Sequence, residues 1–149
     1  MPNILVKLPV GVFNAAARAT LVAGINSAAA AAEQIPDEPK KRMLCWVVLE
    51  EVAVGNWTCG GVDMSAQLVP VLVQINVPHG VLDAAARAQY VAAVQQAVTA
   101  ALPDDTRHII CSCLINEVDD GNWGVRGMIW HLRDFAEHAG FLHLQNLMQ

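Results

Sequence analysis

The chain has little charge, and the charge that it has is mainly acidic. Charged residues make up 15% of the 149 residues, and 14 acidic side chains against 9 basic ones give a net charge of −5. Nucleic-acid-binding proteins concentrate positive charge to neutralise phosphates. The sequence therefore argues against a nucleic-acid partner.

Long hydrophobic runs are also missing, although hydrophobic residues make up 54% of the chain. No segment has the ~18 uninterrupted apolar residues of a membrane span, because Arg18 and Asn26 interrupt the most apolar stretch. The start of the sequence lacks the pattern of a signal peptide, since Lys7 falls inside its apolar stretch. We expect a cytoplasmic protein without a membrane partner.

Metal and phosphate motifs are lacking too. The four cysteines show no C-x-x-C spacing, and two of them alternate on one face of a predicted strand, which suits buried thiols better than zinc; they are Cys45, Cys59, Cys111 and Cys113. Gly60 and Gly61 follow a strand but open no helix, as a phosphate cradle would require. We expect no metal and no other cofactor.

The sequence does contain a copy of itself. Residues 9–18 match residues 78–87 without a gap, with seven of the ten identical, and Glu-Val-x-x-Gly-Asn-Trp occurs at 51–57 and again at 117–123. A long period that is repeated only twice indicates two fused copies of one small unit rather than a solenoid.

Each copy is typical of a strand, a helix and a second strand. Apolar residues alternate in 4–8 and 71–77, which predicts strands. Asn14 and Asp83 are candidate N-caps of amphipathic helices. Second strands are predicted at 43–49 and 109–115. A helix that connects two strands of one sheet implies parallel pairing with a right-handed crossover.

Two such units predict a single α/β domain over residues 1–149. The first unit spans 2–64 and the second 70–128, and together they would form a four-stranded sheet with both helices on one face. Residues 129–148 read as an amphipathic C-terminal helical extension, covering the sheet, a neighbouring subunit or the mouth of an active site. One sheet face then still needs cover, so we expect a homo-oligomer.

Pro2 is the residue with the most direct chemical potential. If Met1 is removed, as small second residues generally allow, the chain starts with a secondary amine at the beginning of a strand. A free α-amino group titrates near ~7.7–8.0, and an apolar pocket lowers that pKa by disfavouring the charged form. Such an amine is suited to general-base catalysis at neutral pH.

A prolyl terminus, a strand, a glycine turn into a helix, and a second strand ending in Glu-Val-x-x-Gly-Asn-Trp together resemble the 4-oxalocrotonate tautomerase family of the tautomerase superfamily. The resemblance covers residues 2–64 and 70–128. Because fused members of this family carry two units and form trimers, it implies a homotrimer. It also implies an isomerase that interconverts the enol and keto forms of a small 2-hydroxy or 2-oxo acid through Pro2.

Two other functions stay open. Some relatives in the superfamily use the proline as an acid to add water to halogenated acrylates, so a hydratase or dehalogenase is one alternative. The other is a non-catalytic oligomeric binder with the same fold, in which Met1 is retained or Pro2 is structural. The resemblance implies one working site per chain, since Pro70 in the second unit is internal and its amide nitrogen has no basic lone pair.

The resemblance also implies substrate-binding residues. Trp57 matches the aromatic position that the family places beside the proline, and Trp123 is its copy. His79 lies in a turn that lines the family's pocket, as a substrate contact or a solvated side chain. The repeated strand-end carboxylates, such as Glu51 and Glu117, are candidate proton relays or simply solvated.

The carboxylate-binding arginines of the family are absent. Val12 follows the first-turn glycine where an arginine is expected, and Trp46 matches the position of the second one. A carboxylate substrate would need a replacement cation. Arg126, just after the second Gly-Asn-Trp, is our first choice for this cation. The alternative is that Arg126 is a solvated charge in a hairpin. The other candidates are Lys7, Arg42, His79 and Arg107.

Overall fold

The computed structural model describes residues 1–148. The first unit contains β1 (Asn3–Pro9), α1 (Ala15–Ala32), the short α2 (Pro39–Arg42) and β2 (Trp46–Val52). The second unit contains β3 (Leu68–Pro78), α3 (Ala84–Ala101) and β4 (His108–Val118). The chain ends with β5 (Trp123–Val125), β6 (Met128–Trp130), α4 (Leu132–Ala139) and the 3-10 helix η1 (Leu142–Met148).

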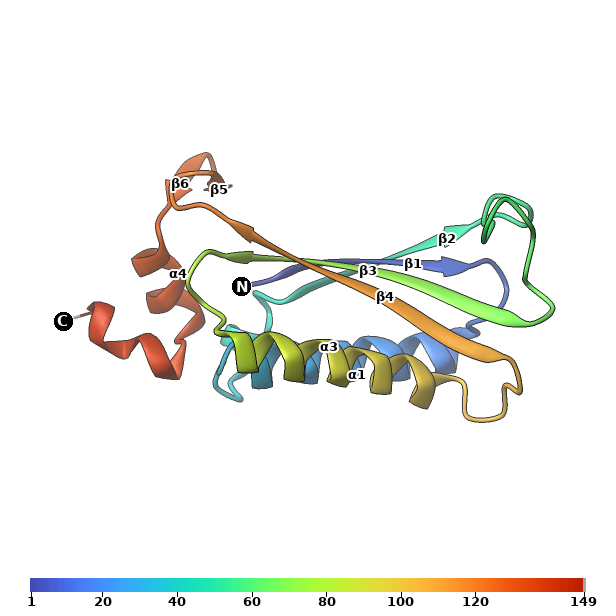
Figure 1. Cartoon of the computed structure of the whole chain (residues 1–149). Helices are drawn as coiled ribbons and strands as arrows, with labels where there is room; N and C mark the ends of the chain where they lie inside the picture. The colour runs from blue at the N-terminus through green and yellow to red at the C-terminus, as the bar shows by residue number, and fades with distance from the viewer. Residues whose placement is uncertain (149) are drawn as a thin grey trace.

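The four long strands form one mixed sheet in the order β2-β1-β3-β4. Each unit contributes a parallel pair, and β1 runs antiparallel to β3 at the centre. Leu5 faces Gln74, which is its counterpart in the other copy, so the local two-fold axis passes between them. Helices α1 and α3 cover the same face (Figure 1). The predicted fold class is confirmed.

Both long helices begin as the sequence predicts. The Asn14 carboxamide oxygen accepts a hydrogen bond from the Ala17 N–H at 2.8 Å, and the Asp83 carboxylate accepts one from the Ala86 N–H at 2.7 Å. These N-caps satisfy backbone donors that the first turn leaves unpaired. The second strands begin or end a few residues away from the predicted ranges, at 46–52 and 108–118.

The two faces of the sheet differ in cover. Alternate side chains such as Ile4, Val6 and Ile75 are fully buried beneath the helices. The opposite face carries apolar side chains that are exposed in the single chain, and Trp46 is 57% exposed; the others are Leu5, Val48, Ile110 and Leu114. Among residues 1–148, no helix packs over that face (Figure 1).

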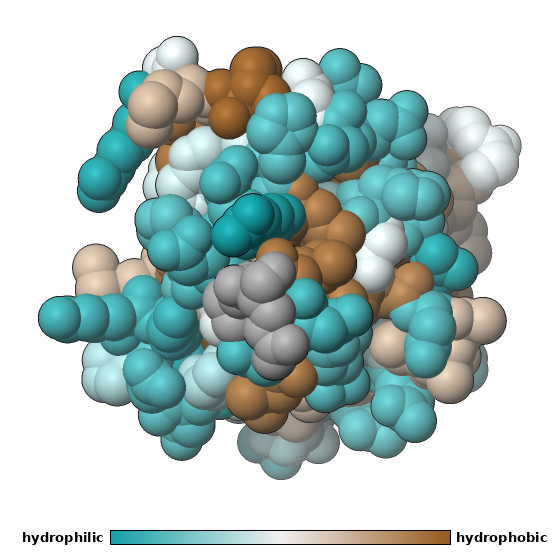
Figure 2. Space-filling view, turned by 90° about the vertical axis from the view of Figure 1, so that its left-hand side faces the viewer, coloured by the Kyte–Doolittle hydropathy of each residue, from teal (hydrophilic) through white to brown (hydrophobic). Residues whose placement is uncertain are grey.

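The C-terminal segment is not the single helix predicted for 129–148. Its first residues pair with β5 in a hairpin, and α4 stops at Gly140, whose left-handed φ of 70° ends the helix before η1. Phe135 of α4 packs edge-on against Trp123 and Trp130, each with ring centroids 5.2 Å apart. The segment therefore packs beside the hairpin at one end of the sheet, and Figure 2 views that end.

In the part of the chain that the structure describes, no helix is both long enough and apolar enough to cross a membrane.

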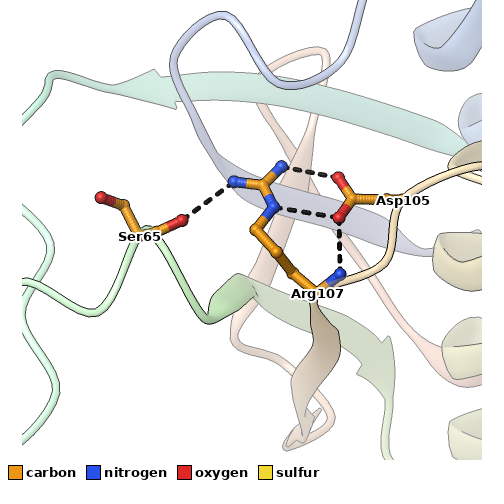
Figure 3. A network of polar contacts seen from close by, with 3 residues as sticks. All are labelled: Ser65, Asp105 and Arg107. Carbon is orange, nitrogen blue, oxygen red and sulfur yellow. Dashed lines mark hydrogen bonds and ion pairs between the residues drawn. The ribbon is translucent and has the colours of Figure 1, made fainter.

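At the opposite end of the sheet, Ser65, Asp105 and Arg107 form a network of polar contacts that we call the clasp (Figure 3). The Arg107 guanidinium donates through Nε and Nη2 to the two oxygens of Asp105, at 2.9 and 2.6 Å, and through Nη1 to the Ser65 carbonyl at 3.0 Å. These contacts fix the loop that joins the two units to the start of β4. Hydrogen bonds from the Arg107 side chain and backbone hold the pKa of Asp105 at about 2.

The clasp predicts a specific loss of stability in acid. A carboxyl with a lowered pKa contributes stability that is complete above its unfolded pKa of about 4 and is lost as the pH falls towards 2. In the Asp105→Asn variant this acid dependence should be absent. We expect the corresponding loss in the wild type's free energy of unfolding to be about 1 kcal/mol, because the pair is partly solvated. Urea unfolding followed by tryptophan fluorescence between pH 6 and pH 2.5 measures it.

The matched control is Asp104→Asn, which changes an exposed neighbour and should leave the acid dependence unchanged. Parallel stability curves for the wild type and Asp105→Asn over this pH range would contradict the prediction.

Candidate active site

A cavity of about 360 Å³ lies where β1 begins. Its walls come from the first residues of β1 and β2, from the β5–β6 hairpin and from α4; they include Met1, Asn3, Trp46, Trp123, Arg126, Trp130 and His138. Three tryptophans therefore surround a space that also receives one guanidinium. Pocket walls of this kind, mostly apolar with a few polar groups, are typical of small-molecule sites.

The direction of the central strands explains why these residues meet. Because β1 and β3 are antiparallel, the segment that follows β4 comes back to the start of β1, and the segment that follows β2 comes to the start of β3. Trp123 accordingly shares the cavity with Met1. Trp57 lies at the opposite end, in a separate cavity of about 100 Å³ that also contains Pro70 and Arg107.

Within one chain, the tryptophan near the start of β1 is thus Trp123, whereas the sequence had suggested Trp57. Trp57 matches the family's aromatic position when each unit is aligned by itself, but it is the copy, Trp123, that contributes to the cavity at the start of β1. The sequence contains no local signal for this exchange, because it follows from how the two units are joined.

Pro2 is buried and does not itself line the cavity, whereas its chain neighbours Met1 and Asn3 do. Its carbonyl accepts a hydrogen bond from the Trp46 N–H at 3.0 Å, which fixes the start of β1 against β2. Met1 is only 4% exposed. The Met1 amino group contacts Glu33 Oε2 at 3.1 Å, and the Glu33 side chain is fully buried.

Glu33 is a residue that the sequence analysis missed. Burial raises the pKa of its carboxyl, and the positive charge of the amino terminus opposes that rise. A glutamate after a run of alanines at the end of a helix ordinarily points into solvent, so the sequence contains no sign of its burial. The helix before it has no other acidic residue from Ala15 to Ala32, but this does not distinguish a buried glutamate from an exposed one.

Arg126 is the one proposed cation that lines this cavity. It occupies the turn between β5 and β6 with a left-handed φ of 53°, followed by Gly127 at 78°. The other candidates are engaged elsewhere: Lys7 with Glu50 at 3.3 Å, Arg42 with Asp37 at 3.3 Å, and Arg107 in the clasp. No ion pair among residues 1–148 involves Arg126, so its guanidinium is available to an anion.

His79 does not line the cavity at the start of β1. Its side chain is 65% exposed and its Nδ1 lies 3.9 Å from Glu117, which is also bound by Arg87 at 2.8 Å. Glu117 is therefore committed to an ion pair. Glu51, its counterpart in the first unit, lies 3.7 Å from Arg18.

A different histidine, His138, lines the cavity. It is an exposed residue of α4. Its ring lies on Trp130 with centroids 4.4 Å apart. Its Nδ1 donates to the Asp134 carbonyl at 2.8 Å, which leaves Nε2 as the nitrogen that can contact a ligand.

No group of three or more His, Cys, Asp or Glu side chains within residues 1–148 is arranged to hold a metal ion. The cysteines are half-buried and free. Burial raises the pKa of Cys111 to about 12 and that of Cys113 to about 11, so these thiols are protonated near neutral pH.

Comparison with known proteins gives matches in structure but not in sequence. No family model and no curated protein matches the chain. Among solved structures, a wild-type fused 4-OT that is an asymmetric trimer matches with a TM-score of 0.69 and 20% identity, over 85% of this chain and 94% of that one. A fused 4-OT that is a symmetric trimer matches at 0.66 and 19%, over 92% and 98%.

Two further matches extend the comparison. A member of the cis-3-chloroacrylic acid dehalogenase (cis-CaaD) family has a TM-score of 0.70 and 15% identity, over 98% of both chains. Macrophage migration inhibitory factor from Toxoplasma gondii has a TM-score of 0.63 and 14% identity, over 86% of this chain and 99% of that one. The resemblance found in the sequence is thus confirmed at the level of the fold: the chain folds like the fused, two-unit 4-OT structures.

Proposed function

We propose that the chain is a tautomerase that converts the enol form of a small 2-hydroxy acid into its 2-oxo form, with the Pro2 amine as the general base after removal of Met1. The observation that supports the proposal is the cavity at the start of β1, where Met1, three tryptophans and Arg126 meet, Arg126 being in no ion pair among residues 1–148. We assign this activity to the cytoplasm.

The proposed chemistry needs one base that both accepts and returns a proton. The lone pair of the Pro2 nitrogen accepts the proton of the enol hydroxyl, and the C–O bond becomes a carbonyl as the C=C electrons shift to the adjacent carbon. The resulting ammonium then delivers a proton to that carbon. A rigid pyrrolidine at the start of a strand suits this role, because positioning of the base relative to the substrate lowers the barrier.

Arg126 and the aromatic walls supply binding. Arg126 lines this largely apolar cavity and makes no ion pair with the residues that the structure describes, and its guanidinium is suited to a carboxylate, which it can bind through two parallel hydrogen bonds. Trp46, Trp123 and Trp130 would contact the carbon skeleton of the acid. His138 Nε2 would add one polar contact. We propose Trp123 for the role that the sequence had suggested for Trp57, and we assign no substrate contact to His79.

For Pro2 to act as the base, Met1 must leave before the chain folds. A side chain that is 4% exposed, with its amino group against a buried carboxylate, offers nothing to an aminopeptidase that needs an extended terminus. We therefore infer that Met1 is removed from the nascent chain. In the mature protein the Pro2 amine would border the space that Met1 occupies here.

We also propose that the chain forms a homotrimer. Three of the fused 4-OT structures that match it are trimers. The apolar residues on the helix-free face of the sheet support the same arrangement, because burying such a face is the main source of free energy in obligate association. The row Val48, Leu5, Gln74 and Leu114 crosses all four strands of that face.

A hydratase or dehalogenase is the second candidate function. The match to the cis-CaaD family member covers 98% of both chains, and thus includes the C-terminal segment. In this reaction a protonated Pro2 would act as an acid while water adds to the double bond. Chloride release from cis-3-chloroacrylate tests for it. A chain inactive in both assays would be a non-catalytic binder.

Replacement of the base tests the first proposal. Ketonisation of phenylenolpyruvate and 2-hydroxymuconate is followed by ultraviolet absorbance, with intact mass confirming the loss of Met1. Pro2→Ala leaves a primary amine that no ring holds in place, and it should lower kcat/KM by about 100-fold, the low end of the 10²–10⁴-fold that a positioned general base contributes. Pro70→Ala is the matched control and should keep the wild-type rate, because that proline nitrogen is an amide. Equal rates for the wild type and Pro2→Ala would contradict the proposal.

Replacement of the cation tests substrate binding. Arg126→Gln keeps a polar side chain of similar length but removes the charge, and loss of a charge-assisted hydrogen bond of about 1.5–3 kcal/mol should raise KM about 10- to 100-fold. Arg126→Lys should recover part of the loss. Arg133→Gln, on an exposed position of α4, is the control for net charge. If Arg126→Gln and Arg133→Gln had the same KM as the wild type, Arg126 would not bind the substrate.

Light scattering on a sizing column tests the trimer. The wild type should elute with about three times the chain mass of 16.0 kDa, and Leu114→Glu should lower that mass because it places a charge on the apolar face. Ala88→Glu, on the exposed surface of α3, should remain a trimer. A monomeric wild type at micromolar concentration would refute this arrangement.

A further inference from the structure

Glu33 occupies a position that is unfavourable for a carboxylate in two ways. It is the C-cap of α1 and its side chain is fully buried. Burial removes the hydration of the charge, and the C-terminal end of a helix carries partial negative charge that repels it. A glutamate in this place needs a positive partner, and an uncharged residue of the same size would fit the core more easily.

The positive partner is the amino terminus. The Met1 amino group lies 3.1 Å from Glu33 Oε2, whereas Oε1 is buried without a hydrogen-bond partner among the described residues. Oε2 thus accepts a hydrogen bond from the amino terminus, whereas Oε1 accepts none among the described residues. The free oxygen is an acceptor in a buried place beside the chain end, which is where the proposed base lies.

From this arrangement we propose that Glu33 is a positioning residue of the active site: it pairs with the amino-terminal amine, orients it and sets its protonation. The inference rests on the proposed use of Pro2 as a base and deepens it. No strand-end carboxylate is needed for this role, which separates Glu33 from Glu51 and Glu117, whose partners are Arg18 and Arg87.

We expect the same pairing in the mature chain, because removal of Met1 moves the amino terminus by only one residue. Consecutive nitrogens along an extended backbone are at most about 3.6 Å apart, and opposite charges still shift each other's pKa at about 4–6 Å. A Pro2 amine exposed by loss of Met1 therefore starts no more than about 7 Å from Glu33 Oε2, and we propose that the freed terminus moves the remaining short distance to pair with the carboxylate. The unused Oε1 provides an acceptor for one of the two N–H groups of the prolyl ammonium.

Other titratable groups that face Glu33 do not replace the amine. Tyr90 of α3 is buried with its hydroxyl unpaired, and burial and the charge of Glu33 raise its pKa well above the usual value. Burial raises the pKa of Cys45 to about 11. His143 of η1 also faces Glu33, and its Nε2 donates to the Val81 carbonyl at 2.9 Å. Arg42, near Cys45, is paired with Asp37.

The test is a titration of the amine itself. Protein labelled with ¹⁵N-proline gives one amine signal, from Pro2, beside six imide nitrogens that do not titrate. In Glu33→Gln the midpoint of that signal should fall by about 1–3 pH units, because the nearby negative charge that favours the ammonium is gone. Glu33→Asp, which keeps the charge, should return the midpoint towards the wild-type value.

Two controls isolate the effect. Glu38→Gln removes an exposed carboxylate from the following loop, and His143→Gln removes the other titratable partner on η1; both should keep the wild-type midpoint within a few tenths of a unit. If Glu33→Gln does not fold, the wild type alone decides: the ¹³C signal of the Glu33 carboxyl should respond at the pH where the amine titrates. Coincident midpoints in wild type and Glu33→Gln, or a carboxyl signal that ignores the amine, would overturn the inference.

The rate assay separates this inference from the proposed function. In an active enzyme, the acidic limb of the kcat/KM profile should move to lower pH in Glu33→Gln together with the amine midpoint. A shifted midpoint in a protein inactive on both enol acids would refute the tautomerase but keep the pairing. A Pro2-dependent activity with an unchanged midpoint would keep the tautomerase and reject Glu33.

Discussion

The antiparallel pairing of β1 with β3 is the constraint on which the rest of the structure depends. It joins two strand–helix–strand units about a local two-fold axis, with Leu5 opposite its own counterpart Gln74. It also sends the segment after each unit's second strand to the beginning of the other unit's first strand. Each end of the sheet is therefore built from both copies, and a candidate site in this chain belongs to neither unit alone.

The duplication supplies two equivalent ends, and the sequence makes them different. At one end, the first residues of β1 lie beside three tryptophans and Arg126, which makes no ion pair among residues 1–148. At the other end Pro70 is an amide within a strand, and the nearby Arg107 is held by Asp105 and the Ser65 carbonyl. The two ends thus differ in their arginines: Arg126 lines the cavity that we propose as the active site, whereas Arg107 is held in an ion pair with Asp105.

The features that repeat in the sequence were predictable, and those that depend on how the copies meet were not. Alternation, the caps Asn14 and Asp83, and the repeated Gly-Asn-Trp were enough for the four-stranded sheet with helices on one face. The position of Arg126 in a hairpin after that motif was also visible in the sequence. The exchange of Trp57 for Trp123 was not, because it follows from strand direction between units, which no local pattern encodes.

The C-terminal residues show the same limit at a smaller scale. An amphipathic stripe over 129–148 favours one helix, yet the hairpin pairing of Met128–Trp130 and the left-handed Gly140 divide the segment. In the divided segment, the ring of His138 packs on Trp130 and lines the cavity. Local periodicity describes what a segment can form, and tertiary contacts with the aromatic rings of the hairpin decide which part of it does.

Glu33 changes the electrostatic argument for the proposed base. Apolar walls alone would lower the pKa of a terminal amine, and that was the reason to regard Pro2 as a base near neutral pH. A buried carboxylate acts in the opposite direction and also fixes where the amine points. The helix end that holds Glu33 is a poor place for a negative charge, so the amine and the carboxylate depend on each other. A base tuned by two opposing effects can be adjusted by either one without a change in the fold.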